Sequence, residues 1–414
     1  MRRYVLFILS LVATAMVSAQ THIRVWQGGE ANRMKVANVG DMTFSGGQMT
    51  MKGVRYNLSE IDSIVVVPEI TVRYNGSTAT VKVPKSIEAD VTVDVDGANV
   101  TVTNTNVSNE AEIVLSGTSS NGSFTYNGAY KCTFYLNGLS LTSTKGAALD
   151  IECGKRVAMV LTDGTTNSLT DALGGSQKAC LYCKGHLEVE GGGTLNVTAN
   201  ARHGIATKEY LQLKRSTGSI NILKAGSDGI HCGQYFQMNG GSLTIDGNTA
   251  ADGIQAEYLM LDDNVTPDPA EENNGQVIIK GGALNITVSH EDCKAIKADS
   301  HVTISGGTFV LNALGNGTRG IQTDGNLSIS QTDAATNMTV AVAGGKCTLE
   351  ECIDDPHKCM GFKADGDFHL YGIGKLDMSV TGKKAKGIKV GGTSYLHGNT
   401  SYISLLDCLN IVTD

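Results

Sequence analysis

The stretch that decides the fold is residues 229–254, which read GIHCGQYFQMNGGSLTIDGNTAADGI. The Gly-Ile pair that opens this stretch returns at its end. The same phrase, or a variant with Ala for Gly or Phe for Ile, recurs along the chain, beginning at Gly204, Gly229, Gly253, Ala295, Gly320, Gly361 and Gly387. A fixed period of this kind is typical of a solenoid, in which each repeat buries its apolar face only by stacking on its neighbours.

The spacing of the Gly-Ile phrase separates a solenoid from other repeat folds. Most intervals are 24 to 26 residues, and the two that begin at Gly253 and Gly320 are longer by about 16 residues. We therefore expect an inserted loop in each of these two coils. A four-stranded propeller blade needs about 40 residues, and the chain has no Gly-Gly-x-Gly-x-Asp run of the calcium-binding β-roll type.

One repeat can be divided into strands. Ile230 and Cys232 face inward and His231 faces outward, because side chains alternate along a strand. Further strands are expected at 235–238 and 242–245, so each coil contains three strands, and like strands stack in parallel. The predicted fold class is all-β: a right-handed parallel β-helix (solenoid) of about ten coils, on the order of 50 Å long, with a small N-terminal β module.

The start of the chain has the composition of an export signal. Met1-Arg2-Arg3 is basic, Tyr4 to Val17 is a short apolar run, and Val17-Ser18-Ala19 offers small residues for cleavage. This pattern predicts a secretory signal peptide at residues 1–19 and a secreted protein, located in the periplasm, at the cell surface or outside the cell. No later stretch reaches the roughly 18 apolar residues of a transmembrane helix.

Two parts are expected after the signal peptide. Residues 20–70 form an N-terminal β module or a cap of the solenoid, with strands at Ile23–Trp26 and Ser63–Val67, and residues 71–414 form the β-helix. The formal net charge of −8 gives no support for general nucleic-acid binding, which needs a basic surface, and we expect no nucleic-acid partner. We expect a monomer.

Ten cysteines in an exported chain permit disulfides. Cys153 and Cys183 are predicted to lie on adjacent coils within disulfide reach, or to be unpaired core residues. The second insertion carries three cysteines expected to staple it, with Cys293 as another candidate partner: Cys347, Cys352 and Cys359.

The residue after each Gly-Ile phrase is expected to point outward. These residues form a row along the rod: Ala206, His231, Gln255, Lys297, Gln322, Lys363 and Lys389. Lysines at about 4.8 Å per coil suit a polyanionic chain that lies along the rod. The alternative is a solvated stripe, in which lysine prevents aggregation of the sheet.

The residue before each phrase forms a second row that begins acidic and becomes basic: His203, Asp228, Asp252, Lys294, Arg319, Met360 and Lys386. Asp228 and Asp252 fall on neighbouring coils, and Asp292 is expected one coil later, at the end of the first insertion. Clustered carboxylates suit Ca²⁺, and these three are the predicted metal ligands. The alternative is that Asp simply favours the turn.

Several phrases resemble a known family. They are Lys294-Ala295-Ile296-Lys297-Ala298-Asp299, Gly361 to Asp367, Ile304 to Thr308, Lys386 to Lys389, and Leu161 to Leu169. Over roughly residues 70–405 the chain resembles the bacterial secreted β-helix proteins that bind polygalacturonate and cellulose and carry calcium. The fold of this group is similar to that of the family 9 pectate lyases.

The resemblance and the two rows together predict a non-catalytic protein that binds an acidic, polygalacturonate-like polysaccharide with the help of Ca²⁺. The expected ligand-binding residues are Lys294, Lys297, Arg319, Lys363, Lys386 and Lys389. One alternative is a calcium-dependent polysaccharide lyase with Lys294 as the base, although Gly253 interrupts the fuller Asp set of those lyases. Another alternative is a structural surface rod.

Overall fold

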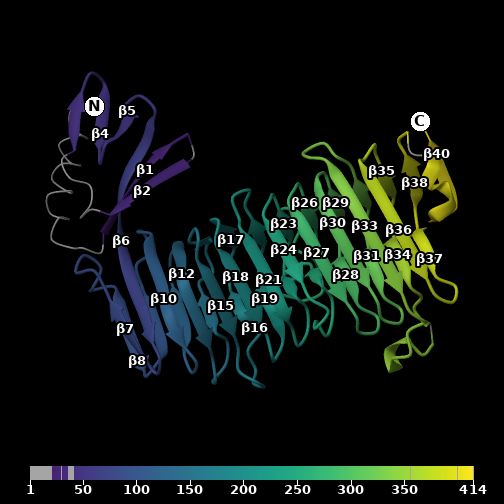
Figure 1. The fold of residues 1–414 in the computed structure, drawn as a ribbon, viewed down its shortest axis with the longest axis horizontal. Coiled ribbons are helices and arrows are strands. Elements are labelled where there is room, and N and C mark those ends of the chain that lie inside the picture. Colours follow the sequence, from purple (N-terminus) through teal and green to yellow (C-terminus); the bar gives the residue numbers. More distant parts are fainter. Residues whose placement is uncertain (1–20, 29, 36–41, 355, 399, 414) are drawn as a thin grey trace.

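The computed structural model describes residues 21–28, 30–35, 42–354, 356–398 and 400–413, so the predicted signal peptide lies outside the described residues. These residues form an elongated all-β molecule whose sequence runs from one end of the long axis to the other (Figure 1). The only helical segments described are the short 3₁₀ turns η2 (Glu350–Cys352) and η3 (Thr400–Leu405). None of the described helices is long and apolar enough to span a membrane.

The repeat at residues 229–254 contains the three strands expected from its sequence: β22 (Ile230–Cys232), β23 (Phe236–Met238) and β24 (Ser242–Ile245). Their side chains alternate between buried and partly exposed positions, so each strand contributes one face to the core. Each strand pairs in parallel with its equivalent in the next coil: β25 (Ile254–Ala256), β26 (Val277–Ile279) and β27 (Ala283–Val288).

One of the two large sheets has thirteen strands in the part of the chain that the structure describes, and we call it the thirteen-strand sheet. All of its pairings are parallel except the first, between β8 and β9. Besides β22 and β25 its strands are β8 (Val91–Asp96), β9 (Asn99–Asn104), β11 (Ser123–Gly128), β13 (Leu149–Glu152), β16 (Ala179–Cys183), β19 (His203–Thr207), β28 (Lys294–Ala298), β31 (Arg319–Thr323), β34 (Met360–Ala364), β37 (Lys386–Val390) and β39 (Leu406–Asp407).

Within the described residues the other large sheet has 24 strands, four of which are β23, β24, β26 and β27. Its remaining members are β1 (Thr21–Gln27), β2 (Glu30–Lys35), β6 (Ile61–Asn75), β7 (Thr78–Lys82), β10 (Ala111–Ser119), β12 (Cys132–Thr142), β14 (Val157–Leu161), β15 (Thr166–Thr170), β17 (Leu187–Glu190), β18 (Thr194–Thr198), β20 (Leu211–Leu213), β21 (Ser219–Lys224), β29 (Val302–Ile304), β30 (Gly307–Ala313), β32 (Leu327–Ile329), β33 (Thr336–Ala343), β35 (Phe368–Leu370), β36 (Lys375–Thr381), β38 (Thr393–Leu396) and β40 (Asn410–Thr413). A third, antiparallel sheet consists of β3 (Thr43–Ser45), β4 (Gln48–Met51) and β5 (Val54–Asn57).

The repeated phrase begins with glycine for a steric reason. A Cβ on Gly204 would lie 2.5 Å from the carbonyl oxygen of Gly229, and one on Gly229 would lie 2.8 Å from the oxygen of Gly253. Real Cβ atoms do not approach backbone this closely. Where the phrase begins with Gly, it therefore marks the point at which the backbones of two coils come into contact.

The N-terminal module is continuous with the rest of the molecule. Strand β1 pairs antiparallel with the first half of β6, and the second half of β6 pairs in parallel with β10. The predicted boundary at residue 70 therefore falls inside β6. Both strands expected in this module are present, within β1 and β6.

The two insertions lie after β25 and after β33, at residues 257–276 and 344–359. The expectation that Asp292 ends the first insertion is wrong, because the inserted residues leave the coil earlier, between β25 and β26. Asp292 lies in the ordinary turn before β28. The spacing of the phrase gives the size of an insertion but not its place within the coil.

The cysteines divide differently from the expectation. Cys347 and Cys352 form a disulfide within the second insertion, while Cys293 and Cys359 are unpaired. Cys153 and Cys183 are also unpaired and buried. They do not face each other in the sheet, where Cys183 pairs with Ile151. Of the two interpretations of Cys153 and Cys183, the unpaired core residue is the one observed.

Candidate functional site

Three adjoining hollows run along the outer side of the thirteen-strand sheet. The first has a volume of about 320 Å³, the second about 550 Å³ and the third about 540 Å³. Lys178 and Tyr182 line both the first and the second, and His203 and His231 line both the second and the third. The hollows therefore form one continuous depression from β13 to β28, which we call the sheet groove.

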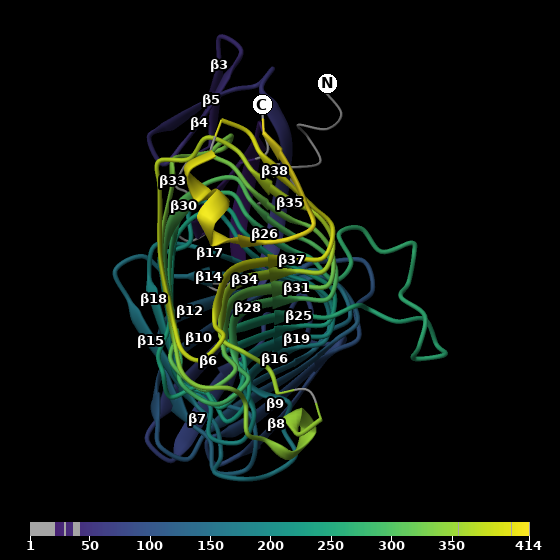
Figure 2. The same cartoon turned by 90° about the vertical axis from the view of Figure 1, so that its right-hand side faces the viewer.

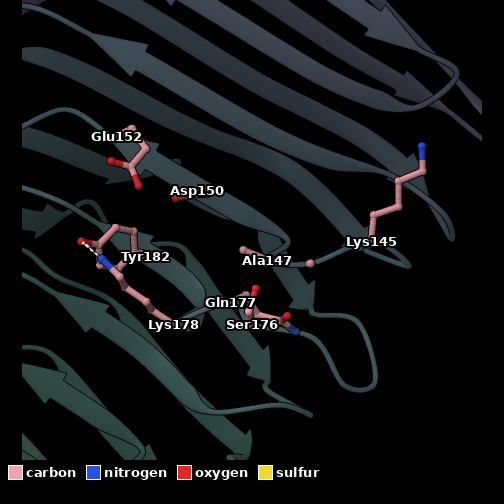
Figure 3. A pocket seen from close by; sticks show the side chains of 9 residues that line it. Lys145, Ala147, Asp150, Glu152, Ser176, Gln177, Lys178 and Tyr182 are labelled. Atoms are coloured by element: carbon pink, nitrogen blue, oxygen red, sulfur yellow. Dashed lines mark hydrogen bonds between the residues drawn. The ribbon is translucent and has the colours of Figure 1, made fainter.

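The first hollow combines acidic and basic side chains (Figure 3). Asp150 and Glu152 come from β13, and Lys178 lies just before β16 on the next coil. The Lys178 ammonium donates a hydrogen bond of 2.9 Å to the hydroxyl of Tyr182, and lies over its ring at 4.3 Å. Burial, together with the negative charge of Glu152, raises the pKa of Asp150.

The two insertions border the sheet groove. Residues 258–262 of the first insertion line the second hollow, and Leu349 and Glu351 of the second insertion line the third. Figure 2 shows both insertions projecting beyond the stacked strands, the second one carrying η2. The insertions therefore deepen what would otherwise be an open sheet face.

Two histidines and an aspartate meet where the second and third hollows join. The Nδ1 atoms of His203 and His231 lie 3.1 and 3.0 Å from the same oxygen, Oδ2 of Asp228. The two imidazole rings are stacked with centroids 4.3 Å apart. Burial alone would raise the pKa of Asp228, but hydrogen bonds from both histidines outweigh it and hold the pKa well below its usual value.

The other two predicted metal ligands have basic or backbone partners. Asp252 accepts a 2.7 Å hydrogen bond from the backbone N–H of Lys294, and burial raises its pKa to about 6. Asp292 lies 3.0 Å from the Lys294 ammonium and 2.7 Å from Nδ1 of His357. Among the residues that the structure describes, the carboxylates of Asp228, Asp252 and Asp292 do not converge within 4.8 Å of one another.

The outward row has the register expected from the sequence. Lys297 pairs with Gln255 on one side and Gln322 on the other, and Lys363 pairs with Gln322 and Lys389. All three lysines are partly exposed. Because Gln255 lines the third hollow, this lysine row continues the sheet groove toward the C-terminal end of the molecule.

The remaining predicted basic residues are placed differently. Lys294 is 9% exposed and Arg319 is 4% exposed, and both point their charge at Asp292. Lys386 forms an ion pair with Asp407. Lys294 and Arg319 are therefore part of a buried ion-pair cluster rather than free surface cations.

Sequence reasoning missed several residues of the groove. Lys178, Tyr182 and Arg202 lie outside the repeated phrase, and nothing in their local sequence marks them. His203 and His231 did stand in the two rows, one phrase apart. Their appearance on neighbouring coils beside an aspartate was the signal that could have found the cluster.

Comparison with known proteins identifies the family. A carbohydrate-binding domain-containing protein from Acetivibrio thermocellus is 29% identical over 139 residues, which are 31% of this chain and 48% of that protein. The chain thus matches about half the length of this relative. A solved structure of the polysaccharide lyase-like protein from C. thermocellum, a gadolinium derivative, covers 67% of this chain and 99% of its own, with 21% identity and a TM-score of 0.48.

The family model that matches spans most of the repeats, from residue 96 to residue 366. The matched segment includes all three hollows of the sheet groove. This chain therefore belongs to the family of carbohydrate-binding domain-containing proteins.

Proposed function

We propose that this protein is a secreted, non-catalytic protein that binds an acidic, polygalacturonate-like polysaccharide along the sheet groove and the lysine row. The parallel sheets are, in this proposal, the walls of a right-handed β-helix of about ten coils. The observation that carries the proposal is the continuity of the three hollows with the row of Lys297, Lys363 and Lys389. A long depression along a rod matches the shape of an extended chain.

The dimensions support a polymer rather than a single sugar. The groove runs over five successive strand steps, from β13 to β28, which corresponds to about 24 Å at about 4.8 Å per step. The lysine row adds several further steps. An oligosaccharide in extended form fits this length, whereas a monosaccharide would occupy only one hollow.

The basic side chains along this path favour an anionic ligand. Lys178, Arg202 and Lys208 line the second hollow, and the lysine row follows beyond the third. The third hollow is acidic, with Glu257, Glu291 and Glu351 on its border. An anionic chain that crosses it needs a cation there, and Ca²⁺ would serve this purpose.

The calcium ligands proposed from the sequence are Asp228, Asp252 and Asp292. Asp228 faces two imidazoles and Asp292 faces a lysine, so these three carboxylates fit an oxygen-only calcium site poorly without rearrangement. Binding is therefore measured both with Ca²⁺ and with a chelator. If chelation leaves binding unchanged, calcium is not part of the site.

The lysine row is tested by neutralising it. We expect the triple variant Lys297→Gln, Lys363→Gln, Lys389→Gln to bind polygalacturonate roughly tenfold more weakly, since three partly exposed charge contacts of about 0.5 kcal/mol each sum to about 1.5 kcal/mol. Affinity electrophoresis in gels containing polygalacturonate, with and without Ca²⁺, measures this loss. The loss should shrink at high salt because screening weakens exposed ion pairs.

The matched control removes the same charge elsewhere. Arg73, Lys82 and Lys85 are exposed and lie in or next to β6 and β7, outside the thirteen-strand sheet. The triple Gln variant of these three should bind like the unchanged protein. Equal retardation by neutral glycans, or equal losses in both triple variants, would contradict an acidic ligand on the lysine row. Accumulation of unsaturated uronate products, lost in Lys294→Ala, would instead favour the lyase.

Asp150 gives the binding a pH dependence. Its raised pKa means that it loses its negative charge earlier on acidification than an exposed carboxyl, while polyuronate carboxylates stay ionised above about pH 5. Repulsion in the first hollow should therefore fall, and retardation should rise, as acidification protonates Asp150. Asp150→Asn should bind more tightly at pH 7.5 and show a smaller increase. An identical pH profile in the two proteins would place the ligand elsewhere.

A further inference from the structure

His203, Asp228 and His231 form a cluster in the sheet groove, and the polysaccharide proposal uses only Asp228 of the three, as a calcium ligand that fits poorly. Each of the three residues offers one ligand atom, and these atoms lie within 4.8 Å of one another. We propose that the three side chains form a binding site for a divalent transition metal, with Zn²⁺ as the reference ion. This metal site would extend the proposed function, and the role of the metal in ligand binding rests on that function.

The donor set selects the class of metal. Two imidazole nitrogens and one carboxylate suit Zn²⁺, Cu²⁺ or Ni²⁺, whereas Ca²⁺ takes six to eight oxygen ligands. This separates the cluster from the calcium site predicted from the same aspartate. With Asp228 shared between two histidines, nitrogen donors outnumber oxygen donors.

The distances agree with a small tetrahedral ion. Metal–ligand bonds of about 2.0–2.1 Å place the ligand atoms of a tetrahedral zinc site about 3.3 Å apart. The Asp228 Oδ2 atom lies 3.1 Å from Nδ1 of His203 and 3.0 Å from Nδ1 of His231. Nδ1 of His203 also accepts a 3.3 Å hydrogen bond from the backbone N–H of Asp228, and the two imidazole rings are stacked, so metal binding breaks this hydrogen bond and turns the rings toward the ion. A proton on Nδ1 of His231 would be released to solvent.

The backbone fixes the three residues in place. His203 is the first residue of β19, Asp228 lies in the turn before β22, and His231 is within β22. The backbone N–H of Gly204 bonds the carbonyl of Asp228, and Ala206 pairs with His231 in the parallel ladder. Ligands held on a rigid ladder lose little freedom when a metal binds.

Two other groups of potential ligands lack this character. Asp292, Cys352 and His357 are close together, but Cys352 forms a disulfide with Cys347 and has no thiolate to offer a metal. His22, Glu69 and Glu112 are close together too, but Arg24 and Arg33 neutralise the carboxylates. The cluster in the groove has neither defect.

The location gives the metal a function. Three protein ligands leave a fourth tetrahedral position open, as in zinc sites that bind an exchangeable group. His203 and His231 line both the second and the third hollow. The open position therefore faces the groove, where a carboxylate or hydroxyl of the polysaccharide can bind the metal directly.

Metal binding is tested on the full mature chain after chelator treatment. Titration calorimetry with Zn²⁺ alone should give one saturable site, and Co²⁺ should give the visible absorption of a tetrahedral complex. His231→Gln and His203→Ala should each weaken Zn²⁺ binding by at least about 100-fold and abolish the Co²⁺ spectrum. His290→Gln, which changes an exposed histidine outside the groove, should leave both unchanged.

The outcomes separate this inference from the polysaccharide proposal. Circular dichroism confirms that each variant is folded, and His231→Gln is the safer variant because His231 is partly exposed. No saturable Zn²⁺ site, equal loss in His290→Gln, or displacement of Zn²⁺ by millimolar Ca²⁺ would overturn the metal site. Polygalacturonate retardation measured with and without Zn²⁺ is scored separately. Unchanged retardation in a zinc-binding protein would overturn only the bridging role.

Discussion

Replacing Glu112 by alanine is expected to lower the free energy of unfolding by about 3–5 kcal/mol. Glu112 is 0% exposed and joins the N-terminal module to the first coil. Its carboxylate accepts hydrogen bonds from Nε of Arg24 at 2.8 Å and from Nε of Arg33 at 2.7 Å, and lies 3.4 Å from Nδ1 of His22. Removing the Glu112 carboxylate leaves largely buried cations with only part of their countercharge. Stability falls strongly when only one partner of a buried ion pair is removed.

Urea denaturation followed by circular dichroism measures this loss, and hydrogen exchange shows whether β1 and β2 open first. Lys145→Ala is the matched control, because it breaks the exposed pair between Lys145 and Asp96 and should leave the free energy of unfolding nearly unchanged. A Glu112→Ala protein that unfolds within about 1 kcal/mol of the unchanged one would mean that water or the remaining acids compensate the arginines.

Gly253→Ala is expected to destabilise the protein by about 1–3 kcal/mol, the usual cost of forcing an extra group into a packed interior. A Cβ at Gly253 would lie 2.5 Å from the carbonyl oxygen of Ala295 and 2.5 Å from Cγ2 of Ile286. The first contact is with backbone of the next coil, so relief requires that two coils separate. Thermal unfolding monitored by circular dichroism measures the change.

Gly372→Ala provides the control for this substitution. A Cβ on Gly372 would meet nothing within 4 Å, and its backbone is not in the left-handed region. This variant should be as stable as the unchanged protein or slightly more so, because alanine restricts the unfolded chain. Equal stability of the two variants would show that the coils are looser at Gly253 than the structure indicates.

The register of the rod is predictable because one chemical signal repeats at one structural position. Gly-Ile marks the close contact between coils, so aligning the phrases is enough to place Lys297, Lys363 and Lys389 in one row, and the strand pairings agree with that row. The all-β class and the three strands of a coil follow from the alternation of apolar residues. These features are local in sequence and repeat many times.

The burial of individual rows is not predictable in the same way. Lys294 and Arg319 stand in a row that begins at His203. Both are buried, and their charged groups face Asp292, which lies in the turn before β28. The period of a repeat says which residues share a line along the rod. It does not say which turn or insertion covers that line, because those segments differ from coil to coil.

The buried charges at the N-terminal end were missed for another reason. His22 and Glu112 lie far apart in the sequence and meet only because β1 pairs with β6 and β6 pairs with β10. Neither residue belongs to a repeated pattern. Contacts that depend on one irregular pairing give no periodic signal.

Strand β6 has a mechanical consequence. Its first half is hydrogen-bonded to β1 and its second half to β10, without a break between them. Tension applied to the N-terminal module would pass through this single strand into the first coil instead of stretching a linker. The module and the rod should therefore rotate together as one rigid unit. An attachment at the N-terminal end would then fix the direction of the sheet groove.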